Sequence, residues 1–501
     1  MLFNSYPFIL LFLPVTLLGY VLIGKKLGRG AGFGWLVAAS LFFYGWWSWF
    51  NLALLLGSLF FNYAAGTWLG RLEKRRPARL VLGVALAFNL GFLAYFKYAN
   101  FFIENVNAAL KLHWAFTEVA LPLGISFYTF QKIAYLVDSY QGKTRGYGFR
   151  DFCLFVSFFP QLIAGPIVHH SEIMPQFRQQ NLERNHWDDW SVGLTLFVFG
   201  LSKKVLIADR LATFASPVFK VAASGAQCGL TEAWLGALAY TLQLYFDFSG
   251  YTDMAIGLAR LFGIRLPMNF NSPYQALDIA DFWRRWHMTL SRFLRDYLYI
   301  PLGGNRHGAA RKYVNLFVTM LIGGIWHGAG WTFVIWGALH GTYLLVYHLW
   351  NDRRVGRAEA KVSWPVRVAA QGATFLAVVL AWIFFRADSV ATAVNLLSSM
   401  VGAHGWTSNW ARLSASTGWA WVGVGLLVVW VLPNTHQILA RFEPCLEYMK
   451  AAGTSAFAPR LPGAARWQWA PRPLWACCVA VLAVASIIGL AKVTEFIYWQ
   501  F

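Results

Sequence analysis

Residues Asp281–Gly330 read DFWRRWHMTLSRFLRDYLYIPLGGNRHGAARKYVNLFVTMLIGGIWHGAG. Of the three histidines in the stretch, His287 and His327 lie in mostly apolar surroundings, and a cluster of arginines and lysines separates them. In water this pattern would be ordinary. In a bilayer an ionisable side chain is costly, and it marks a candidate functional site. The meaning of the stretch therefore depends on how apolar the rest of the chain is.

The composition places the chain in a membrane. Of its 501 residues, 58% are hydrophobic and 13% are charged, whereas soluble domains carry about 25% charged residues. Long apolar runs recur from end to end, which predicts an all-α, polytopic membrane protein. The net charge of +20 fits basic cytosolic loops better than nucleic-acid binding, since no basic domain stands apart from the apolar runs. The five cysteines lack metal-ligand spacing and receive no role.

A helical span needs about 20 apolar residues, which predicts about 11 to 13 spanning or re-entrant helices in one membrane-embedded domain, 1–501. The first run, Pro7–Ile23, has its charges after it and no small-residue cleavage site, so we expect a retained span. Segments 118–137 and 152–169 contain prolines and are expected to be broken or re-entrant, which indicates a cavity. The candidate spans are 7–23, 32–50, 51–69, 79–97, 118–137, 152–169, 190–215, 232–263, 312–328, 331–350, 368–386, 417–433 and 473–493.

The basic loops predict the orientation, because lysine and arginine gather on the cytosolic side. This orientation leaves the amino terminus and the tail Lys492–Phe501 on the extracytosolic side. Within 281–300, apolar positions recur at three- and four-residue spacing among arginines, which predicts an amphipathic helix at the cytosolic interface. The clusters expected in the cytosol are Lys25–Arg29, Arg71–Arg79, Arg284–Lys312, Arg353–Arg367 and Arg441–Arg472.

The two histidines are the candidate catalytic residues. His327 follows Lys312 by 15 residues, so a helix starting at the cytosolic surface carries it roughly 22 Å inward. An imidazole there suits general-base chemistry near neutral pH, although a structural histidine bonded to a neighbouring helix fits equally. His287 is open to a plainer interpretation, as a solvated histidine among basic neighbours. The spacing of the two does not support a metal site.

Two groups of polar residues surround these histidines in the sequence. A candidate supporting network consists of buried carboxylates and their partners, of which Arg284 and Arg285 are the nearest bases in sequence; a structural ion-pair network explains it equally well. A basic cluster is suited to an anionic donor headgroup, or to lipid headgroups. The network is Asp247, Asp253, Asn269, Arg284 and Arg285, and the cluster is Arg292, Arg295, Arg306, Arg311 and Lys312.

Several motifs resemble the membrane-bound O-acyltransferase family, in particular the bacterial branch that includes proteins of alginate O-acetylation and of D-alanine transfer to teichoic acids. The resemblance covers most of 1–390, and 400–472 carries no recognisable motif. One departure is Gln161, where some alginate-type relatives have histidine. The motifs are GISFYTFQKIAYLVD (124–138), FFPQLIAGPI (158–167), YFDFSGYTDMAIG (245–257), NFNSPY (269–274), the stretch 281–306 and GGIWHGAGWTFVIWGALHG (323–341).

The resemblance implies tilted helices around a thinned, funnel-shaped centre, with an acyl donor entering from the cytosol. His327 occupies the position of the family's catalytic histidine, and His287 that of its second histidine. The tail EFIYWQF (495–501) resembles a terminal motif in which a tyrosine, here Tyr498, is a candidate acyl carrier. An interfacial aromatic anchor is the alternative for Tyr498.

These observations together predict an enzyme. It would take acetyl, or another short acyl group, from a cytosolic thioester such as acetyl-CoA, and relay it across the bacterial inner membrane without a metal. A separate extracytosolic O-acetyltransferase, with the synthesis and export machinery, would then acetylate an alginate-like or cellulose-like polysaccharide. A transporter or channel for a small acyl donor is the first alternative, and acylation of a lipid or protein is the second.

Overall fold

The computed structural model describes residues 1–178, 186–353, 363–406, 412–450 and 468–491. Throughout these residues the regular secondary structure is helical, with no strand, so the all-α prediction is confirmed. Apolar surroundings favour this outcome, because a helix satisfies its backbone hydrogen bonds within one segment. In the described part of the chain, five segments are long and apolar enough to cross a membrane by length and composition: Pro7–Leu27, Trp49–Arg71, Arg75–Leu110, Trp187–Ala223 and Trp364–Arg386.

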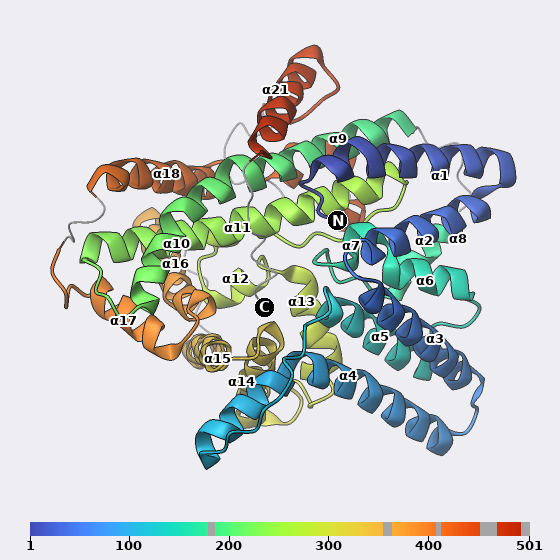
Figure 1. The fold of residues 1–501 in the computed structure, drawn as a ribbon, viewed down its shortest axis with the longest axis horizontal. Coiled ribbons are helices and arrows are strands. Elements are labelled where there is room, and N and C mark those ends of the chain that lie inside the picture. Colours follow the sequence, from blue (N-terminus) through green and yellow to red (C-terminus); the bar gives the residue numbers. More distant parts are fainter. Residues whose placement is uncertain (179–185, 354–362, 407–411, 451–467, 492–501) are drawn as a thin grey trace.

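The first part of the chain builds one side of the molecule (Figure 1). Its long helices alternate in direction, and the chain then enters the interior through short helices. The elements are a π-helical turn Pro7–Phe12, α1 (Leu13–Leu27), α2 (Arg29–Gly45), α3 (Trp49–Arg71), α4 (Arg75–Leu110), α5 (Ile125–Tyr140), α6 (Phe149–Ser157), α7 (Phe159–Leu162) and α8 (His170–Arg178).

The remaining helices form the other side and enclose the centre, where α12 and α13 lie (Figure 1). They are α9 (His186–Ser202), a π-helical turn Lys203–Ala208, α10 (Asp209–Ala223), α11 (Leu230–Leu261), a 3-10 turn Pro273–Gln275, α12 (Ile279–Trp283), α13 (Met288–Leu294), a π-helical turn Arg295–Tyr299, α14 (Gly308–His327), α15 (Trp331–Asp352), α16 (Trp364–Arg386), α17 (Val390–Met400), α18 (Arg412–Val431), α19 (Thr435–Ile438), a 3-10 turn Ala440–Phe442, α20 (Leu446–Lys450) and α21 (Pro473–Gly489).

Glycines set the closest helix contacts. A Cβ added to Gly200 of α9 would lie 2.4 Å from the carbonyl oxygen of Gly250 in α11. A Cβ on Gly324 of α14 would lie 2.4 Å from the Phe333 carbonyl oxygen and 2.8 Å from the Cα of Gly337, both in α15. Small residues of this kind let helix backbones approach in a membrane. The α14–α15 hairpin is thus held in a fixed register, and His327 is the last residue of its first helix.

The stretch 281–300 is not the single amphipathic helix that its periodicity predicts. Helix α12 ends at Trp283 and α13 begins only at Met288. Between them His287 has a left-handed backbone with φ 42°. The reason is tertiary: the Met288 amide donates to the Asn269 carbonyl at 3.0 Å, and the Asn271 amide donates to the Arg285 carbonyl at 2.9 Å. This short antiparallel pairing replaces the helical hydrogen bonds of one turn.

The proline-containing segments are broken, as predicted. Helix α6 ends at Ser157, α7 covers only Phe159–Leu162, and the chain is then irregular until α8 begins at His170. The segment before Ile125 is likewise irregular from Leu112. The irregular stretch around Ile167 is buried against protein, and the Ile167 amide donates to Thr289 Oγ1 at 3.0 Å, whereas most residues of 112–121 are exposed. Irregular backbone at membrane depth requires such cover.

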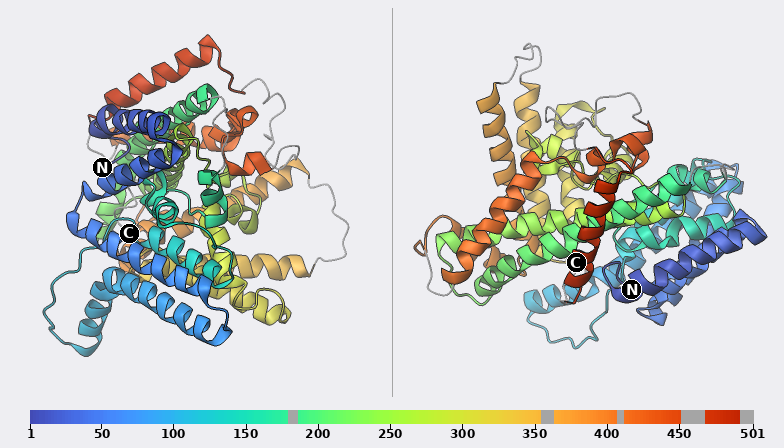
Figure 2. Two further views of the ribbon diagram at one scale, coloured as in Figure 1. Left: turned by 90° about the vertical axis from the view of Figure 1, so that its right-hand side faces the viewer. Right: turned by 90° about the horizontal axis from the view of Figure 1, so that it is seen from above.

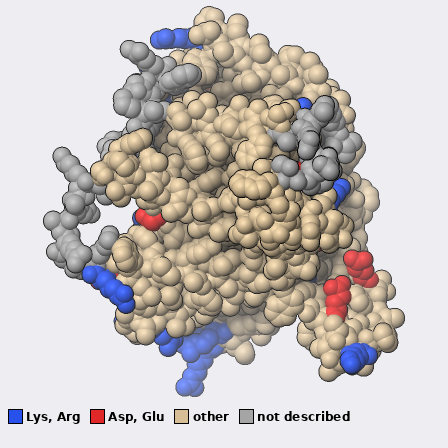
Figure 3. Space-filling view, turned by 90° about the vertical axis from the view of Figure 1, so that its left-hand side faces the viewer, with Lys and Arg blue, Asp and Glu red and all other residues tan. Residues whose placement is uncertain are grey.

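The outer surface fits a lipid environment. In Figure 3 the face shown is largely uncharged, and its lysines and arginines lie at the margins. Figure 2 shows α21 lying along the outside of the molecule, where it packs against α9. Its Leu474 and Ile488 side chains are 74% and 70% exposed. Apolar side chains that are this exposed are compatible with lipid contact rather than with water.

Candidate active site

His287 and His327 meet in the interior although 40 residues separate them in the chain. Their ring centroids lie 6.4 Å apart at an interplanar angle of 60°, and their exposed fractions are 0% and 6%. The pairing of residues 269–271 with residues 285–288 brings His287 to the centre, and the end of α14 brings His327 there. Two imidazoles at this distance can contact one small acyl group.

The orientation of the His287 ring follows from its neighbour Asn269. Asn269 Oδ1 accepts hydrogen bonds from the Thr289 amide at 3.3 Å and from Thr289 Oγ1 at 2.9 Å. Since this oxygen is an acceptor, His287 Nδ1, 3.1 Å away, is the donor. The other ring nitrogen, Nε2, then carries the lone pair. It has no hydrogen-bond partner among the described residues.

Aromatic rings surround both imidazoles. Ring centroids of Trp326, Trp336 and Phe385 lie 4.9 to 5.2 Å from His327. Phe248 stands edge-on to His287 at 4.9 Å. These rings exclude water from the two imidazoles, which strengthens electrostatic interactions within the site.

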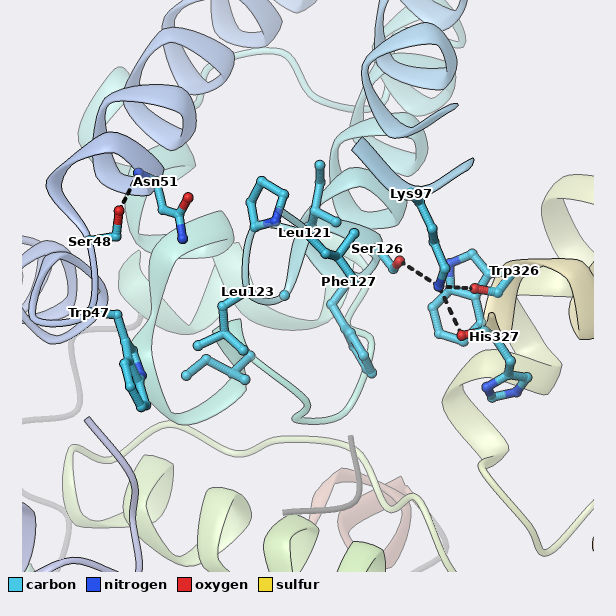
Figure 4. A pocket seen from close by; sticks show the side chains of 14 residues that line it. Trp47, Ser48, Asn51, Lys97, Leu121, Leu123, Ser126, Phe127, Trp326 and His327 are labelled. Atoms are coloured by element: carbon cyan, nitrogen blue, oxygen red, sulfur yellow. Dashed lines mark hydrogen bonds between the residues drawn. The ribbon is translucent and has the colours of Figure 1, made fainter. Parts of the chain in front are cut away.

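A cavity of about 270 Å³ extends from His327 toward the turn between α2 and α3 (Figure 4). Its wall combines apolar groups with hydroxyl, amide and ammonium groups. The rim includes Trp47, which is 44% exposed. Residues on its lining include Trp47, Ser48, Asn51, Lys97, Ser126 and Trp326.

Lys97 of α4 is a site residue that the sequence analysis missed. Its ammonium group donates to the main-chain carbonyl of Trp326, to that of His327 at 2.9 Å and to Ser126 Oγ at 3.3 Å (Figure 4). It thereby occupies the carbonyl end of α14, where a positive charge is favourable. The signal was present: the sequence AYFKYAN places a lysine directly after an uncharged, mostly apolar run, 80–96, and such a residue is a functional candidate.

The supporting carboxylates have partners other than the predicted ones. Asp247 pairs with Lys204 at 2.8 Å and Asp253 with Lys203 at 2.6 Å. The expectation that Arg284 or Arg285 pairs with these carboxylates is wrong, because the π-helical turn Lys203–Ala208 presents two successive lysines to α11. Arg284 is exposed. Arg285 pairs with Asp281 of α12 at 2.8 Å.

The predicted basic cluster does not form one open surface. Arg292 makes two hydrogen bonds of 2.8 Å to the Glu172 carboxylate. Arg295 pairs with Asp296 at 2.7 Å, and Lys312 with Asp352 at 2.8 Å. Arg306 and Arg311 are exposed near the start of α14.

Three further expectations concern Gln161, metal binding and the tail. Gln161 is 1% exposed, and its Nε2 donates to the Phe155 carbonyl at 2.6 Å. Within the described ranges, no group of three or more potential metal ligands occurs. The candidate acyl carrier Tyr498 lies outside the described residues.

Comparison with known proteins identifies the family. The chain has the features of a multi-pass membrane enzyme with a buried two-histidine site. The model of the membrane-bound O-acyltransferase family matches residues 85–384, and the chain belongs to this family of acyltransferases.

Named relatives carry related activities. A peptidoglycan O-acetyltransferase of Helicobacter pylori is 47% identical over 433 residues, which are 81% of this chain and 80% of the relative. A probable alginate O-acetylase AlgI of Pseudomonas putida is 40% identical over 513 residues and covers 100% of both chains. A teichoic acid D-alanyltransferase of Bacillus subtilis is 26% identical over 292 residues, 52% of this chain and 73% of the relative.

Proposed function

We propose that this protein transfers an acetyl or other short acyl group from a cytosolic thioester, acetyl-CoA being the favoured donor, across the bacterial inner membrane. The acceptor is an exported polysaccharide, reached through an extracytosolic or membrane-anchored O-acetyltransferase and the synthesis and export machinery. The observation that carries this proposal is the pair of buried imidazoles, of which His327 lines the cavity and His287 lies 6.4 Å from it, centroid to centroid. The names of the relatives, which specify alginate and peptidoglycan O-acetylation, support a polysaccharide acceptor.

The position of the cavity supports transfer to the far side of the membrane. Helix α2 starts at Arg29 and α3 ends at Arg71, so the turn between them, with Trp47 and Ser48, lies at the end opposite to these basic residues. The positive-inside rule assigns the basic ends to the cytosol. The cavity rim then faces the extracytosolic side, from which an acceptor hydroxyl group can reach His327.

The chemistry requires a base and a hydroxyl group. The hydroxyl oxygen forms a bond to the acyl carbon while the carbon–sulfur bond of the thioester breaks. An imidazole takes the hydroxyl proton and passes it to the leaving thiolate, as in general acid–base catalysis. We assign this role to His327, which lines the cavity, and an assisting contact to His287 Nε2. Tyr498 is the proposed intermediate acceptor, because a phenol needs such a base to become a nucleophile.

The donor headgroup is proposed to bind at the basic side of the molecule. Of the five predicted contacts, Arg306 and Arg311 are exposed and make no ion pair with a carboxylate of the described residues. Arg292, Arg295 and Lys312 are engaged with carboxylates, so a phosphate would have to compete for them. We therefore assign the first contact of the donor to Arg306 and Arg311.

Replacement of His327 with alanine tests the proposal. The acetyl content of the exported polymer should fall to background while the protein still accumulates in the membrane. His340→Gln is the control, because His340 is also fully buried but does not line the cavity. Near-normal acetylation in His327→Ala would refute the assignment.

Labelled acetyl-CoA separates the enzyme from a transporter. The proposal expects label from the acetyl group on Tyr498 or on an extracytosolic acceptor, with free CoA left on the donor side. Intact CoA on the far side of sealed vesicles would instead establish a transporter. Label on a lipid or a protein other than this chain and the polysaccharide transferase would redirect the acceptor assignment.

A further inference from the structure

Residues 434–447 form a segment of the chain beyond the range 85–384 that the family model matches. After α18 the chain turns back and packs on the loop 262–272. The Leu446 amide donates to the Leu266 carbonyl at 3.1 Å, and Arg260 donates to the Glu443 carbonyl at 2.6 Å. The segment is thus fastened both to α11 and to the loop that follows it.

The side-chain amide of Asn434, at the start of this segment, makes hydrogen bonds through both its oxygen and its nitrogen. Its Oδ1 accepts from the Gln437 amide at 2.9 Å and caps α19. Its Nδ2 donates to Asn271 Oδ1 at 3.1 Å and to Ser272 Oγ at 3.0 Å. Asn434 and both acceptor residues are buried. A buried amide with this geometry fixes the position of the loop relative to the segment.

The contacts of Asn434 continue to His287 within a few residues. Ser272 has a left-handed backbone with φ 48°, a conformation that a non-glycine residue keeps only when its surroundings hold it. Two residues earlier in the chain than Asn271, Asn269 accepts from His287 Nδ1. The backbone pairing between 269–271 and 285–288 ties the same two elements together. A shift of the loop at 271–272 therefore moves the acceptor that orients the His287 ring.

We infer that Asn434 is a positioning residue for His287, and that the 434–447 segment holds the loop that carries Asn269. Asn434 acts from a part of the chain outside the matched family region, and it touches neither imidazole. The inference about the position of His287 stands on the contacts alone; its consequence for catalysis rests on the proposed function.

The test measures the protection of His287 directly. Asn434→Ser keeps a hydroxyl oxygen for the helix cap but removes the amide that reaches Asn271 and Ser272. Gln437→Ala is the matched control, because it removes the acceptor for the Asn434 main-chain amide and leaves the Nδ2 contacts in place. The purified full-length chain in lipid nanodiscs is treated with diethyl pyrocarbonate, and carbethoxylation is followed by mass spectrometry. Trypsin releases residues 286–292, which contain His287 as their single histidine.

Carbethoxylation of His287 should rise about fivefold in Asn434→Ser, the factor expected when a buried neutral hydrogen bond is lost. It should remain at the wild-type rate in Gln437→Ala. His340, equally buried, should be unchanged in both variants. An unchanged rate at His287 in Asn434→Ser, or an equal rise at His340, would overturn the inference.

A second variant keeps the test decisive if Asn434→Ser does not accumulate. Ser272→Ala removes one of the two acceptors of the Asn434 amide and leaves Asn434 intact. The rate of His287 carbethoxylation should therefore also rise in Ser272→Ala, and a wild-type rate in this variant would overturn the inference. In the transfer assay, Asn434→Ser should lower kcat and leave the KM for acetyl-CoA unchanged, since no donor contact is altered. If His287 becomes reactive but transfer is unaffected, the positioning role holds and the catalytic role proposed for His287 fails.

Discussion

Lys97 holds the carbonyl end of α14 at His327: its ammonium group donates to the main-chain oxygens of Trp326 and His327 and to Ser126 Oγ. All three donors of the ammonium group are therefore used within the protein. This makes Lys97 a positioning group for the imidazole and not a nucleophile. It also explains a cation at this depth, since the last carbonyls of a helix have no partner within the helix.

Lys97→Met should lower acyl transfer by about 10- to 100-fold, because hydrogen bonds to a charged group contribute about 1.5–3 kcal/mol. Acetyl content of the exported polymer, normalised to the amount of membrane protein, is the measurement. Lys97→Arg keeps the charge and should retain more activity than Lys97→Met. Equal loss in both variants would show that the size of the side chain matters and its charge does not.

Asn269→Ala should impair transfer by about 10- to 100-fold, since it leaves a buried donor on His287 without its acceptor at a cost of about 1–3 kcal/mol. Thr289→Ser is the control, because the remaining hydroxyl group still reaches Asn269 Oδ1. Initial rates with acetyl-CoA in nanodiscs provide the comparison. Full activity in Asn269→Ala would contradict a role for the His287 orientation.

Asp247→Ala should destabilise the protein by about 1.5–3 kcal/mol, the contribution of a hydrogen bond to a charged group, because Lys204 keeps a second carboxylate partner, Asp209, at 2.9 Å. The side chains of Lys204 and Asp247 are 3% and 1% exposed. Thermal unfolding in detergent is the measurement. Asp296→Asn breaks the exposed pair with Arg295 and should cost only about 0–1 kcal/mol. Similar losses in both variants would argue against a buried pair.

Glu447 predicts a dependence of stability on pH. Burial raises the pKa of this carboxyl group above its ordinary value of 4.5, although the Met268 amide that donates to it acts in the opposite direction. A raised pKa in the folded state means that the fold binds the proton more tightly than the unfolded chain does. Its contribution to stability is complete below pH 4.5 and is lost as the pH rises through the folded-state pKa.

Glu447→Gln should remove that part of the pH dependence, because the amide oxygen still accepts from Met268 and carries no charge. Thermal unfolding of the wild type and the variant is compared between pH 4.5 and pH 8. The stability of the variant relative to the wild type should increase toward pH 8. An identical pH profile in both proteins would show that Glu447 titrates alike in the folded and unfolded states.

The fold class could be predicted from the sequence because composition alone determines it: a chain with so few charges folds as helices in lipid. The family followed from the motifs around His287 and His327, and the matched model confirms it. The proline-containing breaks at 118–137 and 152–169 were also foreseen, because proline lacks a backbone donor. The catalytic roles of the two histidines, and that of Tyr498, stay predictions.

Other features depend on contacts that are distant in sequence. The periodicity of 281–300 is helical, yet pairing with residues 269–271 overrides it. The partners of Asp247 and Asp253 come from a π-helical turn some 50 residues earlier, and no rule of sequence proximity finds them. Asn434 is equally remote from His287. Local patterns report secondary structure, whereas these contacts arise only when the helices have packed.

The contact between Gly324 and Gly337 limits how such a chain can change by insertion or deletion. The two helices touch at backbone level, so Gly324 is a fixed reference point, and His327 follows it by three residues. One residue added within that interval would turn the imidazole by about 100° around the helix axis. The cavity wall can therefore be remodelled side chain by side chain, but the interval from Gly324 to His327 must keep its length for the imidazole to keep its direction.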